Sequence, residues 1–117
     1  MVQLGNTELK VSRLGVGLVE IGLQLTRRNR DQADNLLNTA LDGGINFFDT
    51  AECYGISEDL IGEALSHKRD QFVLATKAGH PSFGTEGVRW HVDTLKKSID
   101  RSLLRLKTDY VDILQMH

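Results

Sequence analysis

The feature that most constrains the fold is a regular alternation of short apolar runs with helical patterns along the 117 residues. The apolar runs are bounded by turn residues or helical patterns and are interpreted as strands: "LGVGL" at 14–18, "INFF" at 45–48, "FVLAT" at 72–76 and "YVDILQM" at 110–116. Strands and helices that alternate with a repeat of roughly 30 residues are typical of parallel βαβ units. Runs that are apolar on both sides fit a sheet covered on both faces. The predicted class is therefore α/β.

Helical patterns separate the strands at residues 31–44, 57–68 and 91–107. We expect Asp31 to be the N-cap of the first helix, which the glycines at 43 and 44 would end, and Ser57 to cap the second. The third helix has an apolar face and a charged face. The inward residues are expected to be Val92, Leu95, Ile99, Leu103 and Leu106, and the residues left for water Lys96, Lys97, Asp100, Arg101 and Arg105.

Two further segments differ from this alternation. The stretch "VQLGNTELKV" reads as a small β-hairpin that turns at Gly5 and Asn6, and a hairpin of this kind can plug one end of a barrel. The stretch "GHPSFGTEGVRW" at 79–90 has no periodicity and is predicted to be a long loop of the kind that often borders a site. The whole chain, 1–117, has the usual length of one domain.

Composition argues against several classes of partner. The chain has 14 Lys and Arg against 16 Asp and Glu, a net charge of -2, which gives no electrostatic reason to bind nucleic acid or an anionic membrane. Its first residues contain no apolar stretch of signal-peptide or membrane-span length. The one cysteine, Cys53, excludes an internal disulfide. We therefore expect a soluble, cytoplasmic protein.

Polar residues stand where the predicted strands end. Asp49 ends the second strand with Tyr54 in the loop behind it, Lys77 ends the third and His117 ends the fourth. Because the carboxyl ends of parallel strands meet at one rim, these four side chains are expected to lie together. Side chains alternate along a strand, and the parity places Asp49 and Lys77 on the same side of the sheet.

Each of these residues alone has an ordinary structural explanation, as a turn cap, a solvated lysine, a packed tyrosine or a satisfied histidine. Together they describe a chemical site, because a buried lysine beside a carboxylate can stay charged and a cation close to a phenol favours the phenolate. Such a tyrosine is a usable general acid near neutral pH. We therefore expect a site that donates a proton to a carbonyl oxygen as negative charge develops there.

Several motifs in the correct order resemble the aldo-keto reductases: "RLGVGL", "GGINFFDTAECYGISEDLIGEAL", "FVLATKAG" and "SIDRSLLRLKTDYVDILQMH". The resemblance covers nearly the whole chain and implies a (β/α)8 barrel of the TIM type that reduces aldehydes or ketones, or oxidises the corresponding alcohols, with NADPH or alternatively NADH. It implies that Tyr54 is the acid, assisted by Lys77, and that Asp49 pairs with Lys77 and lies near the nicotinamide ribose. His117 would orient the substrate carbonyl.

Length qualifies the resemblance. A complete barrel needs about 250 residues, whereas this chain contains four strands and resembles the N-terminal part of an enzyme. The alternative is therefore a catalytically inactive truncated fragment or a half-barrel association module, in which open edges and an uncovered apolar face would promote self-association.

The remaining chemical signals are weak. Cys53 could be a nucleophile, but the sequence implies no base nearby, and it is interpreted as a bystander. The histidines at 67, 80, 91 and 117 and Cys53 show none of the close spacings of a zinc site, so no metal is expected.

Overall fold

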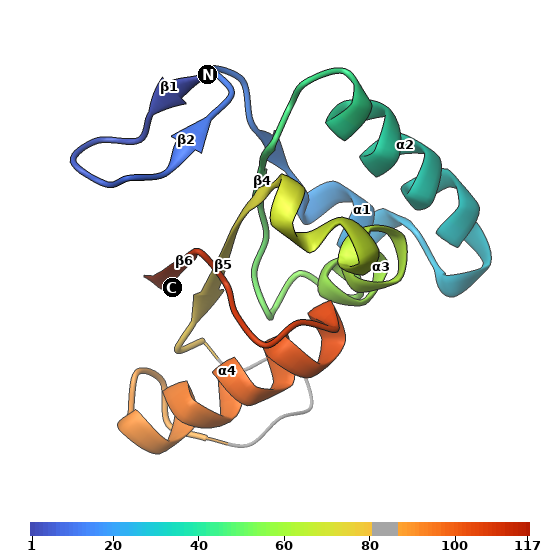
Figure 1. The fold of residues 1–117 in the computed structure, drawn as a ribbon. Coiled ribbons are helices and arrows are strands. Elements are labelled where there is room, and N and C mark those ends of the chain that lie inside the picture. Colours follow the sequence, from blue (N-terminus) through green and yellow to red (C-terminus); the bar gives the residue numbers. More distant parts are fainter. Residues whose placement is uncertain (81–86) are drawn as a thin grey trace.

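The computed structural model describes residues 1–80 and 87–117. Figure 1 shows the chain traced from the N-terminal hairpin, which stands apart from the helices, to the C-terminal strand. Its elements are, in order, β1 (Val2–Gln3), β2 (Lys10–Val11), β3 (Val16–Gly17), α1 (Val19–Gln24), η1 (Arg27–Asn29), α2 (Arg30–Asp42), β4 (Phe47–Asp49), α3 (Ser57–Leu65), η2 (Ser66–Gln71), β5 (Val73–Ala78), α4 (Val92–Leu106) and β6 (Ile113–Met116).

The main sheet contains the four predicted strands in the order β3-β4-β5-β6, and each neighbouring pair is parallel. In the register, Asp49 lies opposite Gly17 on one side and Ala75 on the other. Lys77 lies opposite Gln115 in β6. The carboxyl ends of the strands therefore meet at one rim, as the sequence predicts.

The core lies between this sheet and the helices. Phe48 of β4 and Leu74 of β5 are at most 1% exposed, and Phe48 packs edge to face on Phe72 with 5.5 Å between ring centres. Leu37 of α2 and Ile61 of α3 meet the same cluster. Because side chains alternate along a strand, Asp49 projects to the face opposite Phe48. Burial of the aromatic and aliphatic side chains stabilises the fold by roughly 25 cal/mol per Å² of apolar surface.

The N-terminal hairpin is confirmed. β1 and β2 pair antiparallel, and the connection turns at Gly5, which has a φ of +54°. Asn46 joins the hairpin to the sheet, because its side chain accepts a hydrogen bond from the Ser12 amide at 2.7 Å and donates to the Lys10 carbonyl at 3.1 Å. Of the predicted loop at 79–90, positions 81–86 lie outside the described residues.

The starts of two helices differ from the prediction. α2 begins at Arg30, so Asn29 rather than Asp31 is its N-cap. The N-cap of α3 is Ile56, and the Ser57 hydroxyl is instead buried within 2.8 Å of the Thr50 hydroxyl. The sequence identifies Ser57 as a cap from its residue type, whereas the hydroxyl joins the helix to the end of β4. The predicted end of α2 is confirmed at Gly43.

The predicted faces of α4 are partly wrong. The buried positions on this helix are mostly small and polar: Thr94, Ser98, Ser102 and Leu106. Val92, expected inside, is 59% exposed. Arg101 and Arg105, expected in water, make ion pairs with the buried carboxylates Glu52 and Glu58. Apolar periodicity failed here because the helix packs against one carboxylate of the loop after β4 and one of α3, and carboxylates need polar partners when buried.

Within the residues described, the structure contains no helix that is long and apolar enough to cross a membrane.

Candidate active site

An ion pair between β4 and β5 forms the centre of the rim. The Lys77 ammonium donates to Asp49 Oδ2 at 2.6 Å and to the Thr50 carbonyl at 2.9 Å. The other Asp49 oxygen accepts from Gln115 Nε2 at 2.9 Å. The lysine side chain is only 14% exposed while that of Asp49 is 39% exposed, so the carboxylate keeps one side open to solvent.

Tyr54 lies in the loop after β4, with the Lys77 nitrogen 5.0 Å from the centre of its ring. Two glycines allow this loop to pack closely on α1. A Cβ atom on Gly22 would come within 1.8 Å of the Tyr54 carbonyl, and one on Gly55 would come within 2.1 Å of the Gly22 carbonyl. The Ile56 amide also donates to the Gly22 carbonyl at 3.2 Å. Helix α1, which the sequence did not predict, therefore fixes the position of Tyr54 by packing against the backbone of its loop.

His117 follows β6, and its amide donates to the Ala78 carbonyl at 2.9 Å. Its ring lies edge to face with that of Tyr54 at 5.8 Å between centres and is 5.7 Å from the ring of His80. Burial lowers the pKa of His117, and electrostatic interaction with Lys77 and His80 lowers it further against the opposing effect of Asp49. These surroundings favour the neutral form of the imidazole.

A buried polar network supports the loop that carries Tyr54, and sequence reasoning missed it. Glu52 is 1% exposed and accepts hydrogen bonds from Ser98 and Arg101 of α4. Arg105 donates to the Glu52 carbonyl at 3.1 Å. These partners lie more than 40 residues from Glu52 in the sequence, so no local pattern could indicate them. The available signal was an acidic residue inside the motif "DTAECYG".

A second carboxylate, Glu58 of α3, is also 1% exposed and accepts a hydrogen bond from the Thr76 hydroxyl at 2.7 Å. Burial raises the pKa of Glu58, against the opposing effects of the Thr76 hydrogen bond and the charge of Arg105. The network thus connects α3, α4 and β5 beneath the rim.

The interpretation of Cys53 as a residue without a nearby base is wrong. Its sulfur lies 3.3 Å from Nδ1 of His117, which is 64 residues away in the sequence. Burial raises the pKa of the Cys53 thiol, and the charge of Glu52 also raises it. The thiol is therefore held protonated, which argues against a nucleophilic role.

The rim thus brings together all four residues predicted from the strand ends. It offers a cation beside an aromatic ring, an imidazole with a lowered pKa in edge-to-face contact with the same ring, and a carboxylate partly open to water. Among the described residues, no group of three or more His, Cys, Asp or Glu side chains is arranged to hold a metal ion. The arrangement of these side chains suits proton transfer to a substrate oxygen.

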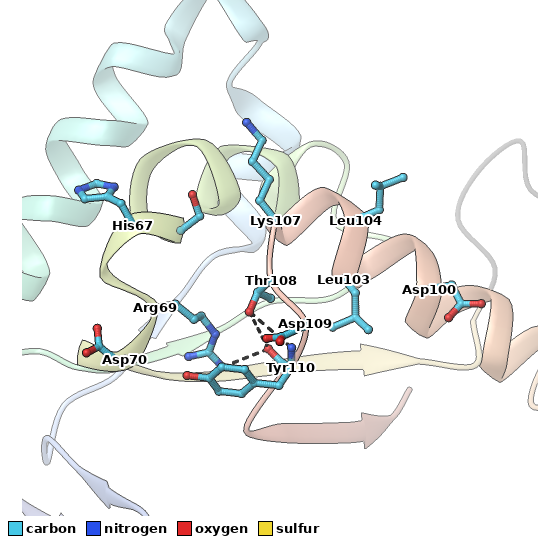
Figure 2. Close-up of a pocket in the computed structure, with 11 residues that line it drawn as sticks. His67, Arg69, Asp70, Asp100, Leu103, Leu104, Lys107, Thr108, Asp109 and Tyr110 are labelled. Atoms are coloured by element: carbon cyan, nitrogen blue, oxygen red, sulfur yellow. Dashed lines mark hydrogen bonds between the residues drawn. The ribbon is translucent and has the colours of Figure 1, made fainter.

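A different groove lies at the opposite end of the sheet (Figure 2). It is formed by η2, the end of α4 and the loop that leads to β6, and it is lined by Ser66, His67, Arg69, Asp70, Asp100, Leu103, Leu104, Lys107, Thr108, Asp109 and Tyr110. In parallel barrels the amino ends of the strands generally serve stability, whereas the carboxyl ends carry the chemistry.

Comparison with known proteins agrees with this geometry. The model of the aldo/keto reductase family matches residues 13–117, so the chain belongs to the aldo/keto reductase family, a family of oxidoreductases. L-galactose dehydrogenase of Arabidopsis thaliana is 42% identical over 119 residues, which cover 97% of this chain and 36% of that protein.

Two solved structures extend the comparison. A putative aldo-keto reductase from Pseudomonas aeruginosa superposes with a TM-score of 0.86 at 36% identity, covering 99% of this chain and 45% of that one. An aldo/keto reductase from Klebsiella pneumoniae, solved with NADP and acetate, gives a TM-score of 0.73 at 29% identity over 92% of this chain and 35% of that one. The four parallel strands are thus about the first half of a TIM-type (β/α) barrel, and the chain spans less than half the length of these relatives.

Proposed function

We propose that the protein carrying this chain reduces small aldehydes or ketones, or oxidises the corresponding alcohols, with a nicotinamide cofactor. The observation that carries the proposal is the position of Tyr54, whose ring has the Lys77 ammonium 5.0 Å from its centre and the His117 ring 5.8 Å away on an edge-to-face contact. Membership of an oxidoreductase family supports the same reaction class.

The proposed roles follow from charge. Tyr54 donates its phenolic proton to the carbonyl oxygen as negative charge develops there, and the nearby ammonium of Lys77 stabilises the phenolate left behind. Asp49 keeps Lys77 in place through the 2.6 Å ion pair. His117, held neutral, donates a hydrogen bond to the same oxygen and orients the substrate.

The rim fits one end of a nicotinamide cofactor. Asp49 has a carboxylate that is 39% exposed beside the lysine, and such an oxygen can accept a hydrogen bond from a ribose hydroxyl. A reduced nicotinamide supplies the hydride when it is bound. We propose NADPH as the cofactor, with NADH as the alternative, and the complex of the Klebsiella relative with NADP supports this choice. The proposed compartment is the cytoplasm, where a single unpaired thiol stays reduced.

The test is Tyr54→Phe in the full-length protein, followed as oxidation of NADPH in the presence of a panel of aldehydes. Removal of the general acid should lower kcat by about 10²- to 10⁴-fold. Quenching of protein fluorescence by NADPH should be unchanged, because the substitution removes only a hydroxyl. If Tyr54→Phe turned over substrate at close to the wild-type rate, the assignment of Tyr54 would be contradicted. If the wild-type protein reduced none of the aldehydes and ketones tested, the reaction class would be contradicted.

A further inference from the structure

The contact between Cys53 and His117 has no role in the reaction as proposed above. The thiol lies in the same loop as Tyr54, one residue before it, and its sulfur is 3.3 Å from Nδ1 of the imidazole. One of the two ring nitrogens of His117 is therefore occupied within the protein. The other, Nε2, is the nitrogen available to a substrate.

The surroundings of this pair favour the uncharged form of both members. Around His117, burial, Lys77 of β5 and His80 lower the imidazole pKa, and only Asp49 of β4 raises it. Around Cys53, burial raises the thiol pKa, as do the charges of Glu52 and Glu58, against its own backbone hydrogen bond and Lys77. A thiolate facing an imidazolium would require the opposite shifts, so the contact joins a thiol and a neutral ring.

In a neutral pair the chemical character of the two atoms decides which one donates. A thiol is a weak donor and its sulfur is a weak acceptor, whereas an unprotonated imidazole nitrogen is a good acceptor. The favoured arrangement is therefore S–H pointing to Nδ1. A neutral imidazole carries one proton, so that proton must then be on Nε2.

We propose that Cys53 is a positioning residue that holds His117 in the tautomer with its proton on Nε2, so that this N–H donates to the substrate's carbonyl oxygen. The inference rests on the proposed function, in which His117 orients that oxygen. In the other tautomer an Nε2 lone pair would face the oxygen lone pairs, and the hydrogen bond that stabilises developing negative charge would be lost.

Two variants separate hydrogen bonding from packing. Cys53→Ser keeps a donor with less volume, and Cys53→Val keeps the volume without a donor. The full-length protein is labelled with ¹⁵N-histidine, and the ¹⁵N chemical shifts of the two ring nitrogens report the tautomer, with the resonances of residue 117 assigned by their loss in His117→Gln. Thermal unfolding of both variants establishes that each retains its fold.

Wild type and Cys53→Ser should both show the proton on Nε2. In Cys53→Val the ratio of the two tautomers should shift toward Nδ1–H by about two- to tenfold, the equilibrium value of one hydrogen bond. A Cys53→Val spectrum identical to wild type would overturn the inference, as would equal shifts in the serine and valine variants, because these would indicate packing alone.

Kinetics provide the second readout. kcat for an aldehyde should fall in Cys53→Val by about the same two- to tenfold factor and be retained in Cys53→Ser. The NMR measurement does not require turnover. It therefore tests the effect of Cys53 on the His117 tautomer even if the proposed reaction is wrong. A wild type that reduces no carbonyl would overturn the proposed function, whereas normal kcat in Cys53→Val with an altered tautomer would overturn only the role of that tautomer in catalysis.

Discussion

Two ion pairs lie near the two ends of β5, and they differ in what surrounds them. At the carboxyl end, Lys77 and Asp49 are 2.6 Å apart, and the lysine also faces the ring of Tyr54. At the amino end, Arg69 and Asp112 are likewise 2.6 Å apart. The distance within the pair therefore does not distinguish the proposed chemical site from an ion pair with a structural role.

At the amino end, aromatic rings and backbone carbonyl groups surround the ion pair. The Arg69 guanidinium lies 4.0 Å from the centre of the Tyr110 ring and 5.0 Å from that of Phe72, and it donates to the carbonyls of both residues. Asp112 also accepts from the Leu74 amide at 2.8 Å. Figure 2 shows Arg69 and Tyr110 side by side in this groove. The contacts of Arg69 with Tyr110 and Asp112, and that of Asp112 with Leu74, join the η2–β5 segment to the chain that leads to β6.

The difference between the two ion pairs indicates that the groups around a charged side chain determine whether it can take part in chemistry or only in packing. The carboxyl-end cation faces a phenol that can lose a proton, and its partner Asp49 is 39% exposed, whereas Asp112 is 16% exposed. We therefore expect substitutions at the amino end to change stability and those at the carboxyl end to change chemistry, in agreement with the usual division of labour in parallel barrels.

The largest effect is expected from Arg69→Met. It removes the cation of a largely buried pair and leaves Asp112 without its charged partner, which should lower the free energy of unfolding by about 3–5 kcal/mol. Urea denaturation of the full-length protein measures this loss. kcat measured below the unfolding transition should stay near the wild-type value. A loss of turnover without a loss of stability would contradict the assignment of a structural role to the amino end.

A smaller effect is expected from Lys77→Met, and it should appear in chemistry. Loss of the ammonium beside Tyr54 should lower kcat by about 10²- to 10³-fold, as for other preorganised charges in active sites. The free energy of unfolding should change by less than for Arg69→Met, because Asp49 remains partly hydrated and keeps its hydrogen bond from Gln115. Steady-state kinetics and urea denaturation of both variants provide the comparison.

The next effect concerns the close packing of α1 behind the rim. In Gly22→Ala the new methyl group would meet the Tyr54 carbonyl at 1.8 Å, so the backbone must shift. Overpacking of this kind costs about 1–3 kcal/mol in stability, and displacement of Tyr54 should also lower kcat. Gly43→Ala at the C-cap of α2 is the control, because its φ of -77° suits any residue and the atom nearest an added Cβ, the Thr39 carbonyl oxygen, is 3.1 Å away. Equal kinetics in the two variants would contradict a role for α1 in placing the tyrosine.

The smallest effect is a pH dependence confined to the carboxyl end. Because the pKa of His117 is lowered in the folded protein, the unfolded chain binds more protons between that lowered value and the ordinary value of about 6.5. The contribution of His117 to stability should therefore rise with pH through this window and be constant outside it. Comparing urea denaturation of wild type and His117→Gln across the window should give a steeper rise for wild type, and parallel curves would refute the shift.

The sequence alone predicted the four rim residues because strand-end position and side-chain parity are local properties. Asp49 and Lys77 are on the same side for that reason. It did not predict helix α1, since six residues are too few for a periodic pattern, and the glycine at 22 argues against a helix. Nor did it predict that Arg101 reaches Glu52, because an arginine on a charged helix face has the same pattern whether its partner is water or a buried carboxylate.

The contact of Cys53 with His117 was missed for a related reason. The two residues are 64 positions apart, and only the pairing of β4, β5 and β6 brings the loop after β4 to the end of β6. A contact between two single side chains so far apart in the sequence depends on which strands are neighbours in the sheet, and no local pattern of residues indicates it.

The two tyrosines of the chain provide the most direct test of the contrast between the ends, because Tyr54→Phe and Tyr110→Phe make the same chemical change at opposite ends of the sheet. The measurement is kcat for reduction of one aldehyde by NADPH in the full-length protein. The account predicts a loss of about 10²- to 10⁴-fold for Tyr54→Phe and a value near wild type for Tyr110→Phe. Equal losses in the two variants, or no loss in Tyr54→Phe, would contradict it.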